Sequence, residues 1–412
     1  MSLGKPSRIL LVLGTSAGGV GRHVRMLAEG LAREGDRVVV AGPVSTDEAF
    51  GFSEVAGFAG VPVADRPRPG RDLRAVLRLR ALAAGADVVH AHGLRAGALA
   101  ALALTGRRTR LVVTLHNALT AGGVVGAIWG VLERITAARA DMVLVVAPDL
   151  GERMTARGAR HVAPAVVPAP PLAPPSRLAA DVHALLAAAA PARPTAAGGP
   201  GAGGDTAAVA GPVPGGETAM APEEGAGLGE RPVLLTVARL AQQKGLDTLL
   251  TVAGGEFAGG VRPLFVVAGD GPLRERLQGR IDEEGLPVVL LGERGDVADL
   301  LLVARALVVP SLWEGQPLSV HEALRAGVPV VGMAVGGIPG MVGDAGVLVP
   351  AGDVEGLRRE ISRLLTEPGL ARRLGEAAAA RVLPGEQDAL RAVRAAYGGL
   401  RGKGAGLGGS RE

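Results

Sequence analysis

The chain alternates short apolar runs with longer stretches in which apolar residues recur every three or four positions. Short apolar runs bounded by Gly, Pro or polar residues predict buried parallel strands, and the periodic stretches predict the helices between them. The pattern predicts strands at residues 8–13, 37–41, 87–92, 110–117, 141–147 and 162–167, and again at 232–237, 264–268, 288–291, 306–309, 328–332 and 346–349. Repeated strand–helix units in both halves predict an α/β protein with two doubly wound parallel sheets facing each other.

A change of composition separates the two halves. Residues 168–230 consist largely of Ala, Pro and Gly, and such a segment cannot bury enough apolar surface to order itself. At 412 residues the chain is also too long for one ordinary core. We therefore predict an N-terminal domain at 1–167, a flexible linker at 168–230 and a C-terminal domain at 231–385. A closing helix at 386–400, with a return to the N-terminal domain as one option, precedes a disordered tail at 401–412.

Composition excludes several classes of protein. The chain has no Cys, which excludes disulfides, thiolate catalysis and cysteine-bound metals, and which fits a reducing cytoplasm. Its formal net charge of +4 is mild and its pI of 10.2 reflects an excess of Arg over Lys, so nucleic-acid binding is not predicted. Residues 8–13 fit a first strand better than a signal peptide, and no apolar run is long enough for a membrane span.

Two stretches bear on contact with a membrane surface. Residues 121–132 are almost entirely apolar and predict a buried helix, with a helix lying on a membrane as the alternative. Arg71, Arg74 and Arg78 share one helical face. A solvated face is the preferred interpretation, and attraction to an anionic lipid or acceptor is the alternative.

The most informative stretch is PSLWEGQPLSVHEALRAG at residues 310–327. An apolar strand, a Gly/Pro loop and a helix start form the unit that offers backbone N–H groups and a positive helix end to an anionic ligand. Glu314 and Glu322 stand eight residues apart in it. Because carboxylates repel phosphate, they would contact hydroxyl groups beside it, and this combination indicates a sugar nucleotide.

Cations and glycines follow other predicted strands. Arg239 and Lys244 come just after the strand at 232–237, and two cations at the carboxyl edge of a sheet suit a diphosphate. The glycine-rich turn at residues 14–21 either admits a ligand to a helix start or is only a tight turn. Its spacing departs from that of dinucleotide-binding turns, so NAD is not predicted.

Two histidines end successive predicted strands. His92 follows one apolar run and His116 the next. Because parallel strands bring their carboxyl ends to one edge, we expect both side chains to face one cleft. No carboxylates accompany them at a spacing typical of zinc ligands, so a zinc site is not predicted.

Taken together, these stretches resemble glycosyltransferase family 4, retaining enzymes of the GT-B fold, over most of residues 8–167 and 231–400. In the second half the resemblance rests on ARLAQQKGLDTLL, VVAGDGPLRERL, PSLWEGQPLSVHEALRAGVPVV and VGGIPGMVGDAGVLVPAGD. Glu314 and Glu322 have the family's E-x7-E spacing. In the first half it rests on GGVGRHV, DVVHAHGLRAG and VVTLHN.

The resemblance implies a donor site with parts from both domains. The diphosphate would be bound by Arg239, Lys244, Gly18 and Gly19, and the phosphates and sugar would be lined by the backbone of Gln316, Pro317 and Leu318. The ribose would lie at Glu322, the donor sugar at Glu314 and His116, and the nucleobase at Gly292 to Arg294. Two departures stand out. Gly340 replaces an acidic residue, and Pro168-Ala169-Pro170 with the long linker replaces a short P-N-G link.

Glu314 and His116 are the residues expected closest to the chemistry. The resemblance implies a front-side displacement with retention of configuration, so we name no nucleophile and assign Glu314 to hydroxyl recognition. No D-x-D triplet occurs in the chain, so we expect no metal and no cofactor beyond the nucleotide-sugar cosubstrate.

We therefore expect a glycosyltransferase that uses a nucleotide-sugar and acts on a small molecule, a lipid or a polysaccharide. It is expected in the cytoplasm, and for a lipid acceptor at the inner face of the cell membrane. A sugar-nucleotide epimerase on the same fold and a non-catalytic nucleotide-sugar binding protein are the alternatives.

Overall fold

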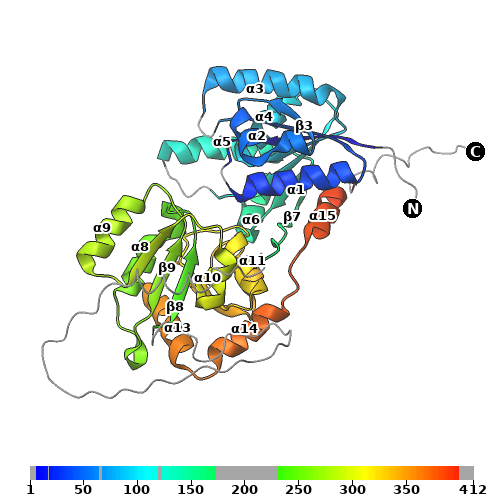
Figure 1. Cartoon of the computed structure of the whole chain (residues 1–412). Coiled ribbons are helices and arrows are strands. Elements are labelled where there is room, and N and C mark those ends of the chain that lie inside the picture. Colours follow the sequence, from blue (N-terminus) through cyan, green and yellow to red (C-terminus); the bar gives the residue numbers. More distant parts are fainter. Residues whose placement is uncertain (1–5, 17, 65–66, 119–122, 173–230, 399–412) are drawn as a thin grey trace, which may run out of the picture.

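The computed structural model describes residues 6–16, 18–64, 67–118, 123–172 and 231–398, with the side chain of Val124 left out (Figure 1). The predicted tail at 401–412 and nearly all of the predicted linker at 168–230 lie outside the described residues.

The N-terminal domain is built on a seven-stranded parallel sheet with the order β3-β2-β1-β4-β5-β6-β7. Its strands are β1 (Arg8–Leu13), β2 (Arg37–Gly42), β3 (Gly57–Gly60), β4 (Val88–His92), β5 (Arg110–Leu115), β6 (Met142–Val145) and β7 (Val162–Pro164). Its helices are α1 (Gly19–Arg33), α2 (Val44–Phe50), α3 (Pro69–Leu82), α4 (Leu94–Ala103), α5 (Gly123–Arg139) and α6 (Pro148–Ala156), with 3-10 turns at Phe52–Glu54 and Ala83–Gly85. Strand β3, with the sequence GFAG, was not predicted because it is short and half glycine.

The C-terminal domain repeats the plan with a six-stranded parallel sheet of order β10-β9-β8-β11-β12-β13. Its strands are β8 (Val233–Val237), β9 (Leu264–Ala268), β10 (Val288–Gly292), β11 (Ala304–Val309), β12 (Val330–Met333) and β13 (Gly346–Val349). Its helices are α8 (Leu246–Ala253), α9 (Arg274–Glu284), α10 (Val297–Val303), α11 (Leu318–Arg325), α12 (Ile338–Val342), α13 (Val354–Thr366), α14 (Leu370–Ala380) and α15 (Glu386–Gly398), with 3-10 turns at Gln242–Lys244 and Ala258–Gly260.

Both sheets reverse their strand order at one point, between β1 and β4 in the first domain and between β8 and β11 in the second. The inner strands are buried on both faces, as their continuous apolar runs require, and each sheet has its own core. Loops that leave neighbouring strands in opposite directions open a crevice at the carboxyl edge, which is where open α/β sheets bind ligands. The loops after β8 and β11 occupy this position in the C-terminal domain.

The last helix, α15, returns to the N-terminal domain and packs beside α1 (Figure 1). Leu390, Val393 and Tyr397 are buried in the N-terminal core. The two segments that connect the domains also contact each other, since the Ala169 N–H donates to the Pro384 carbonyl at 2.8 Å. Helix α15 therefore completes the core of the N-terminal domain.

The prediction of a buried helix at 121–132 is wrong for the part of it that the structure describes, from residue 123 onward, which belongs to α5. It packs on α4, but Val125, Ile128 and Val131 are 49%, 40% and 52% exposed. A helix that is apolar around its circumference buries only the side that finds a neighbour. Arg71, Arg74 and Arg78 on α3 are exposed, which agrees with a solvated face. Among the described helices, none combines the length and apolar character needed to cross a bilayer.

Candidate functional site

The loops after β8 and β11 meet through an ion pair. Lys244 Nζ lies 2.7 Å from Glu314 Oε1, and the Ser311 hydroxyl donates to the same oxygen at 2.7 Å. Glu314 is only 8% exposed, and no described donor contacts its other oxygen, Oε2. The carboxylate is thus fixed through one oxygen and has the second free to accept from a ligand hydroxyl.

Ser311 was not recognised from the sequence, although it is a polar residue just past a strand end, the same signal that identified His92. Two backbone segments, one at Gly245 and one at Pro310, approach each other closely at this point. Gly245 has φ +62°, and a Cβ on it would lie 2.0 Å from the Pro310 carbonyl oxygen. Only glycine lets the turn that carries Lys244 rest on the start of the Glu314 loop. Arg239, on the same loop as Lys244, is exposed.

Helix α11 begins at the end of the Glu314 loop. Its N-cap residue, Pro317, provides no side-chain hydrogen bond, so the first N–H groups of the helix are left for a ligand. Leu318 at its first turn lies across from α1, because a Cβ on Gly19 would be 3.8 Å from Leu318 Cδ1. The space beside Gly18 is open, with no described atom within 4 Å of a Cβ placed there. The two helix starts therefore face each other across the domain boundary.

Glu322 lies about one turn into α11 and is half-buried. Burial raises the pKa of its carboxyl, and Arg22 of α1 partly offsets this by favouring the charged form. The residue predicted at the ribose is thus influenced by a cation of the other domain.

The side chain of Gln316 joins the domains, a role that the sequence did not predict. Its Nε2 donates to the Ala165 carbonyl at 2.8 Å, and its Oε1 accepts from the Val167 N–H at 3.0 Å. The indole Nε1–H of Trp313 donates to Asp149 Oδ2 at 2.7 Å. The Glu314 loop is consequently held by the N-terminal domain on both sides of the carboxylate.

The predicted nucleobase loop follows β10. The Gly269 N–H donates to the Gly292 carbonyl at 2.6 Å, which connects this loop to the one after β9. The Arg294 guanidinium is paired with Asp296, and this hydrogen bond raises the pKa of Arg294 and lowers that of Asp296. Its side chain is thus engaged within the loop.

The two strand-end histidines come together as expected. His92 Nδ1 lies 3.1 Å from His116 Nε2, with the rings stacked at 22°. The His116 carbonyl lies close to the Glu314 loop, since a Cβ on Gly315 would be 3.4 Å from it. His23 of α1 and His90 of β4 complete a cluster of four imidazoles, in which His116 is partly exposed and the other three are buried.

Burial keeps this cluster neutral. It lowers the pKa of His23 to about 4, and burial together with the charge of His23 lowers the pKa of His90 to about 3. The pKa values of His92 and His116 are also well below 6.5, first through burial and then through the neighbouring imidazoles. No group of three or more His, Asp or Glu among the described residues is arranged to hold a metal.

These shifts predict acid-sensitive folding. The unfolded chain binds protons near pH 6.5 whereas the folded imidazoles resist them, so stability present above pH 6.5 is lost as the pH falls toward 4. For His23 alone the full effect is about 3 kcal/mol, of which about 2 kcal/mol is lost by pH 5. Urea midpoints at pH 7.5 and 5 measure it, and His23→Leu should flatten the pH dependence while the exposed His161→Gln should not. An equal slope in wild type and His23→Leu would contradict this explanation.

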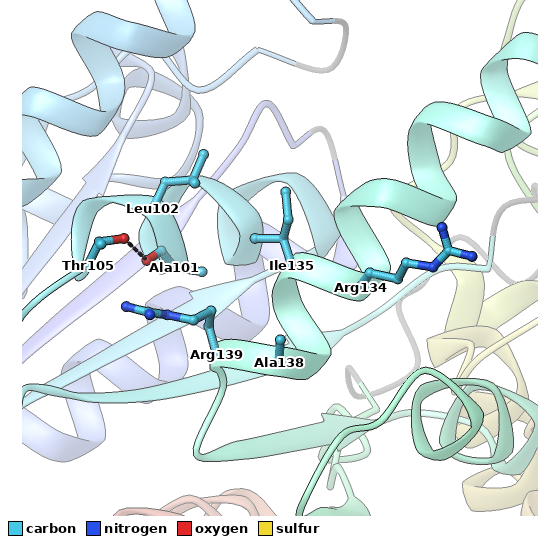
Figure 2. Close-up of a pocket in the computed structure, with 7 residues that line it drawn as sticks. All are labelled: Ala101, Leu102, Thr105, Arg134, Ile135, Ala138 and Arg139. Carbon is cyan, nitrogen blue, oxygen red and sulfur yellow. Dashed lines mark hydrogen bonds between the residues drawn. The ribbon is translucent and has the colours of Figure 1, made fainter.

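Figure 2 shows a pocket between α4 and α5. It is lined by Ala101, Leu102, Thr105, Arg134, Ile135, Ala138 and Arg139. These residues come from the carboxyl-terminal halves of the two helices, which in β–α units lie toward the amino edge of the sheet. The pocket is thus at the edge opposite the candidate site.

Comparison with known proteins assigns both halves of the chain. The family described as glycosyl transferase 4-like domain matches residues 18–170, and the family glycosyl transferases group 1 matches residues 222–381. The chain is 35% identical over 189 residues to 2-deoxystreptamine N-acetyl-D-glucosaminyltransferase of Streptomyces fradiae, covering 43% of this chain and 45% of that protein. It is 30% identical over 159 residues to alpha-D-kanosaminyltransferase of Streptomyces kanamyceticus, covering 37% and 41%. The match thus spans less than half the length of these relatives.

Solved structures agree in fold over nearly the whole chain. The Anabaena protein HepE, in complex with UDP and glucose, matches with a TM-score of 0.70 at 17% identity, covering 96% of this chain and all of that one. Sucrose-phosphate synthase from Thermosynechococcus elongatus gives 0.68 at 21% identity, covering 94% and 98%. These likenesses show the GT-B fold. With a family match on each domain and two facing Rossmann-like sheets, the chain belongs to the family 4-like, group 1 glycosyltransferases.

Proposed function

We propose that this protein transfers a sugar from a nucleoside-diphosphate sugar to an acceptor, with retention of configuration and without a metal ion. The observation that carries the proposal is the Lys244–Glu314–Ser311 contact at the start of α11. A cation, an uncapped helix start and a fixed carboxylate lie at the one point of the sheet where ligands of this architecture bind.

The chemistry follows from what each group can stabilise. As the bond from the sugar C1 to the phosphate oxygen breaks, negative charge grows on the diphosphate, and Lys244, Arg239 and the α11 start would neutralise it. The acceptor oxygen bonds to C1 from the same face, and its proton passes to the leaving phosphate. Glu314 would accept hydrogen bonds from the donor sugar, with His116 beside it, and Glu322 from the ribose.

We assign the acceptor to the N-terminal domain, where Gly19 and His116 lie close to Leu318 and Gly315 of the donor loops. One relative is named 2-deoxystreptamine N-acetyl-D-glucosaminyltransferase, so 2-deoxystreptamine is one acceptor to test. The exposed apolar side of α5 supports including a lipid acceptor, with peripheral membrane contact. A small-molecule extract and a polysaccharide complete the set.

Radiolabelled UDP-, GDP- and ADP-sugars, each incubated with these acceptors, test the proposal. We expect label to move to an acceptor from one donor. Conversion of the donor sugar without acceptor would instead indicate an epimerase, and tight binding without any turnover would indicate a non-catalytic binding protein.

Metal independence is tested in the same assay. Because protein cations and a helix start would neutralise the diphosphate, turnover should be unchanged, within about twofold, after treatment with EDTA and after addition of Mg²⁺ or Mn²⁺. A large loss with EDTA that either ion restores would overturn this part of the proposal.

A further inference from the structure

Two imidazoles of the cluster around His116 have a buried nitrogen without a hydrogen-bond partner, His23 at Nδ1 and His92 at Nε2. His90 is fully engaged, with Nδ1 at 2.8 Å from the Tyr397 hydroxyl and Nε2 at 2.7 Å from the Thr114 hydroxyl. His92 is 3% exposed, and its Nε2 is buried without a partner. Among the described residues, the only hydrogen bond of the His92 side chain joins Nδ1 to His116 Nε2 at 3.1 Å.

This arrangement selects a tautomer. A neutral imidazole carries its hydrogen on one nitrogen and a lone pair on the other, and burial keeps both rings neutral. If the hydrogen of His92 were on Nε2, a buried N–H would have no acceptor, and an orphaned donor is rarer than an unused lone pair. The hydrogen of His92 therefore belongs on Nδ1, from which it is donated to His116.

The consequence for His116 is direct. Its Nε2 accepts from His92, so its own hydrogen is on Nδ1. The two ring nitrogens point in divergent directions, and no described protein atom hydrogen-bonds to His116 Nδ1. The Nδ1–H is thus available to a ligand beside the Glu314 loop, which adjoins the His116 backbone.

We propose that His92 is a positioning residue, which fixes His116 in the Nδ1–H form so that His116 presents a hydrogen-bond donor to a ligand oxygen. The tautomer is a property of the protein alone, and only the identity of that oxygen, on the donor sugar, rests on the proposed function. His116 then acts as a neutral donor and has no free lone pair for use as a general base.

The decisive measurement needs no substitution at His92. The chain has seven histidines, so long-range proton–nitrogen spectra of protein labelled with ¹⁵N-histidine are tractable, with His116→Asn identifying the His116 signals. At pH 7.5 we expect a protonated Nδ1 and an unprotonated Nε2 on His116. A protonated Nε2 would overturn the inference whether or not the protein transfers sugar.

Two variants extend the test to turnover. His92→Leu removes the donor, and His116 should then shift toward the Nε2–H form, which free imidazole prefers. We expect kcat to fall about 10–100-fold, as when other orienting partners of histidines are removed, with the donor KM within about twofold. His92→Asn places an amide N–H near the former Nδ1 and should restore the tautomer and most of kcat.

An unchanged His116 tautomer in His92→Leu would contradict the inference, and so would an equal kcat loss in His92→Leu and His92→Asn. If His92→Leu does not fold, the wild-type spectrum decides alone. If transfer activity is absent altogether, the tautomer measurements still stand, so failure of the proposed function is distinguishable from failure of this inference.

Discussion

Replacing Lys244 by alanine lowers kcat by about 10²–10³-fold, the loss expected when one group that stabilises developing negative charge is removed. Two effects add. The proposed diphosphate would lose a cation, and Glu314, only 8% exposed, loses one of the two groups that hold its Oε1 at 2.7 Å, with Ser311 remaining. Steady-state kinetics and circular dichroism would show lost turnover in a folded protein.

The matched control is Arg363→Ala. Arg363 on α13 also pairs with glutamates, Glu360 and Glu367, but it is half exposed and belongs to no element of the site. Its loss should leave kcat within about twofold, since surface ion pairs contribute little. Glu314→Gln separates the two roles, because it keeps the size and a hydrogen-bonding oxygen while removing the charge. Full activity in both Lys244→Ala and Glu314→Gln would show that the site is assigned wrongly.

Gly337→Ala should destabilise the protein by about 1–3 kcal/mol and weaken donor binding, because it overpacks the contact between the domains. A Cβ on Gly337 would lie 2.1 Å from the Gly315 carbonyl oxygen and 2.9 Å from that of Val146. One of these backbone segments must then move, and the first carries Glu314. The thermal midpoint and the additional shift caused by a bound donor measure the two effects.

Gly340→Ala is the control, three residues further along in α12. No described atom would lie within 4 Å of its Cβ, so we expect unchanged or slightly higher stability and unchanged donor binding. Equal effects of the two substitutions would contradict the account of the turn. The open space at Gly340 also shows that the acidic residue expected there by resemblance would meet no steric obstacle.

The parts of the site that sequence could predict are those with local signals. Apolar runs predicted nearly every strand. The position just after a strand end singled out Lys244, and the Gly/Pro loop after another strand singled out Glu314. The expectation that His92 and His116 share an edge follows from the same rule for parallel strands. The spacing of apolar residues along strands and helices, together with the residue types in the loops, is enough to predict these features.

What could not be predicted depends on contacts between residues far apart in the chain. Gln316 reaches Ala165 and Val167, and Trp313 reaches Asp149, all across the domain boundary. A side-chain type does not indicate which distant carbonyl it meets. Likewise the apolar pattern of α5 predicted burial but could not indicate that one side of the helix has no neighbour.

The hydrogen bonds of Gln316 and Trp313 across the domain boundary connect the Glu314 loop to both domains. The loop that positions Glu314 is attached to the C-terminal sheet through β11 and to the N-terminal domain through these two side chains. Movement of the domains relative to each other therefore acts directly on the carboxylate, so donor binding at the proposed site would be coupled to domain arrangement through this loop.

The central claim is that a nucleoside-diphosphate sugar binds at the loops after β8 and β11. Thermal shift of the wild type and of Lys244→Ala with UDP-, GDP- and ADP-sugars tests it most directly, because a ligand that binds the folded state stabilises it by about 2.7 kcal/mol at 100 times its Kd. We predict that one donor raises the midpoint of the wild type and that Lys244→Ala loses most of this shift. No shift with any donor in the wild type, or an equal shift in both proteins, would contradict the claim.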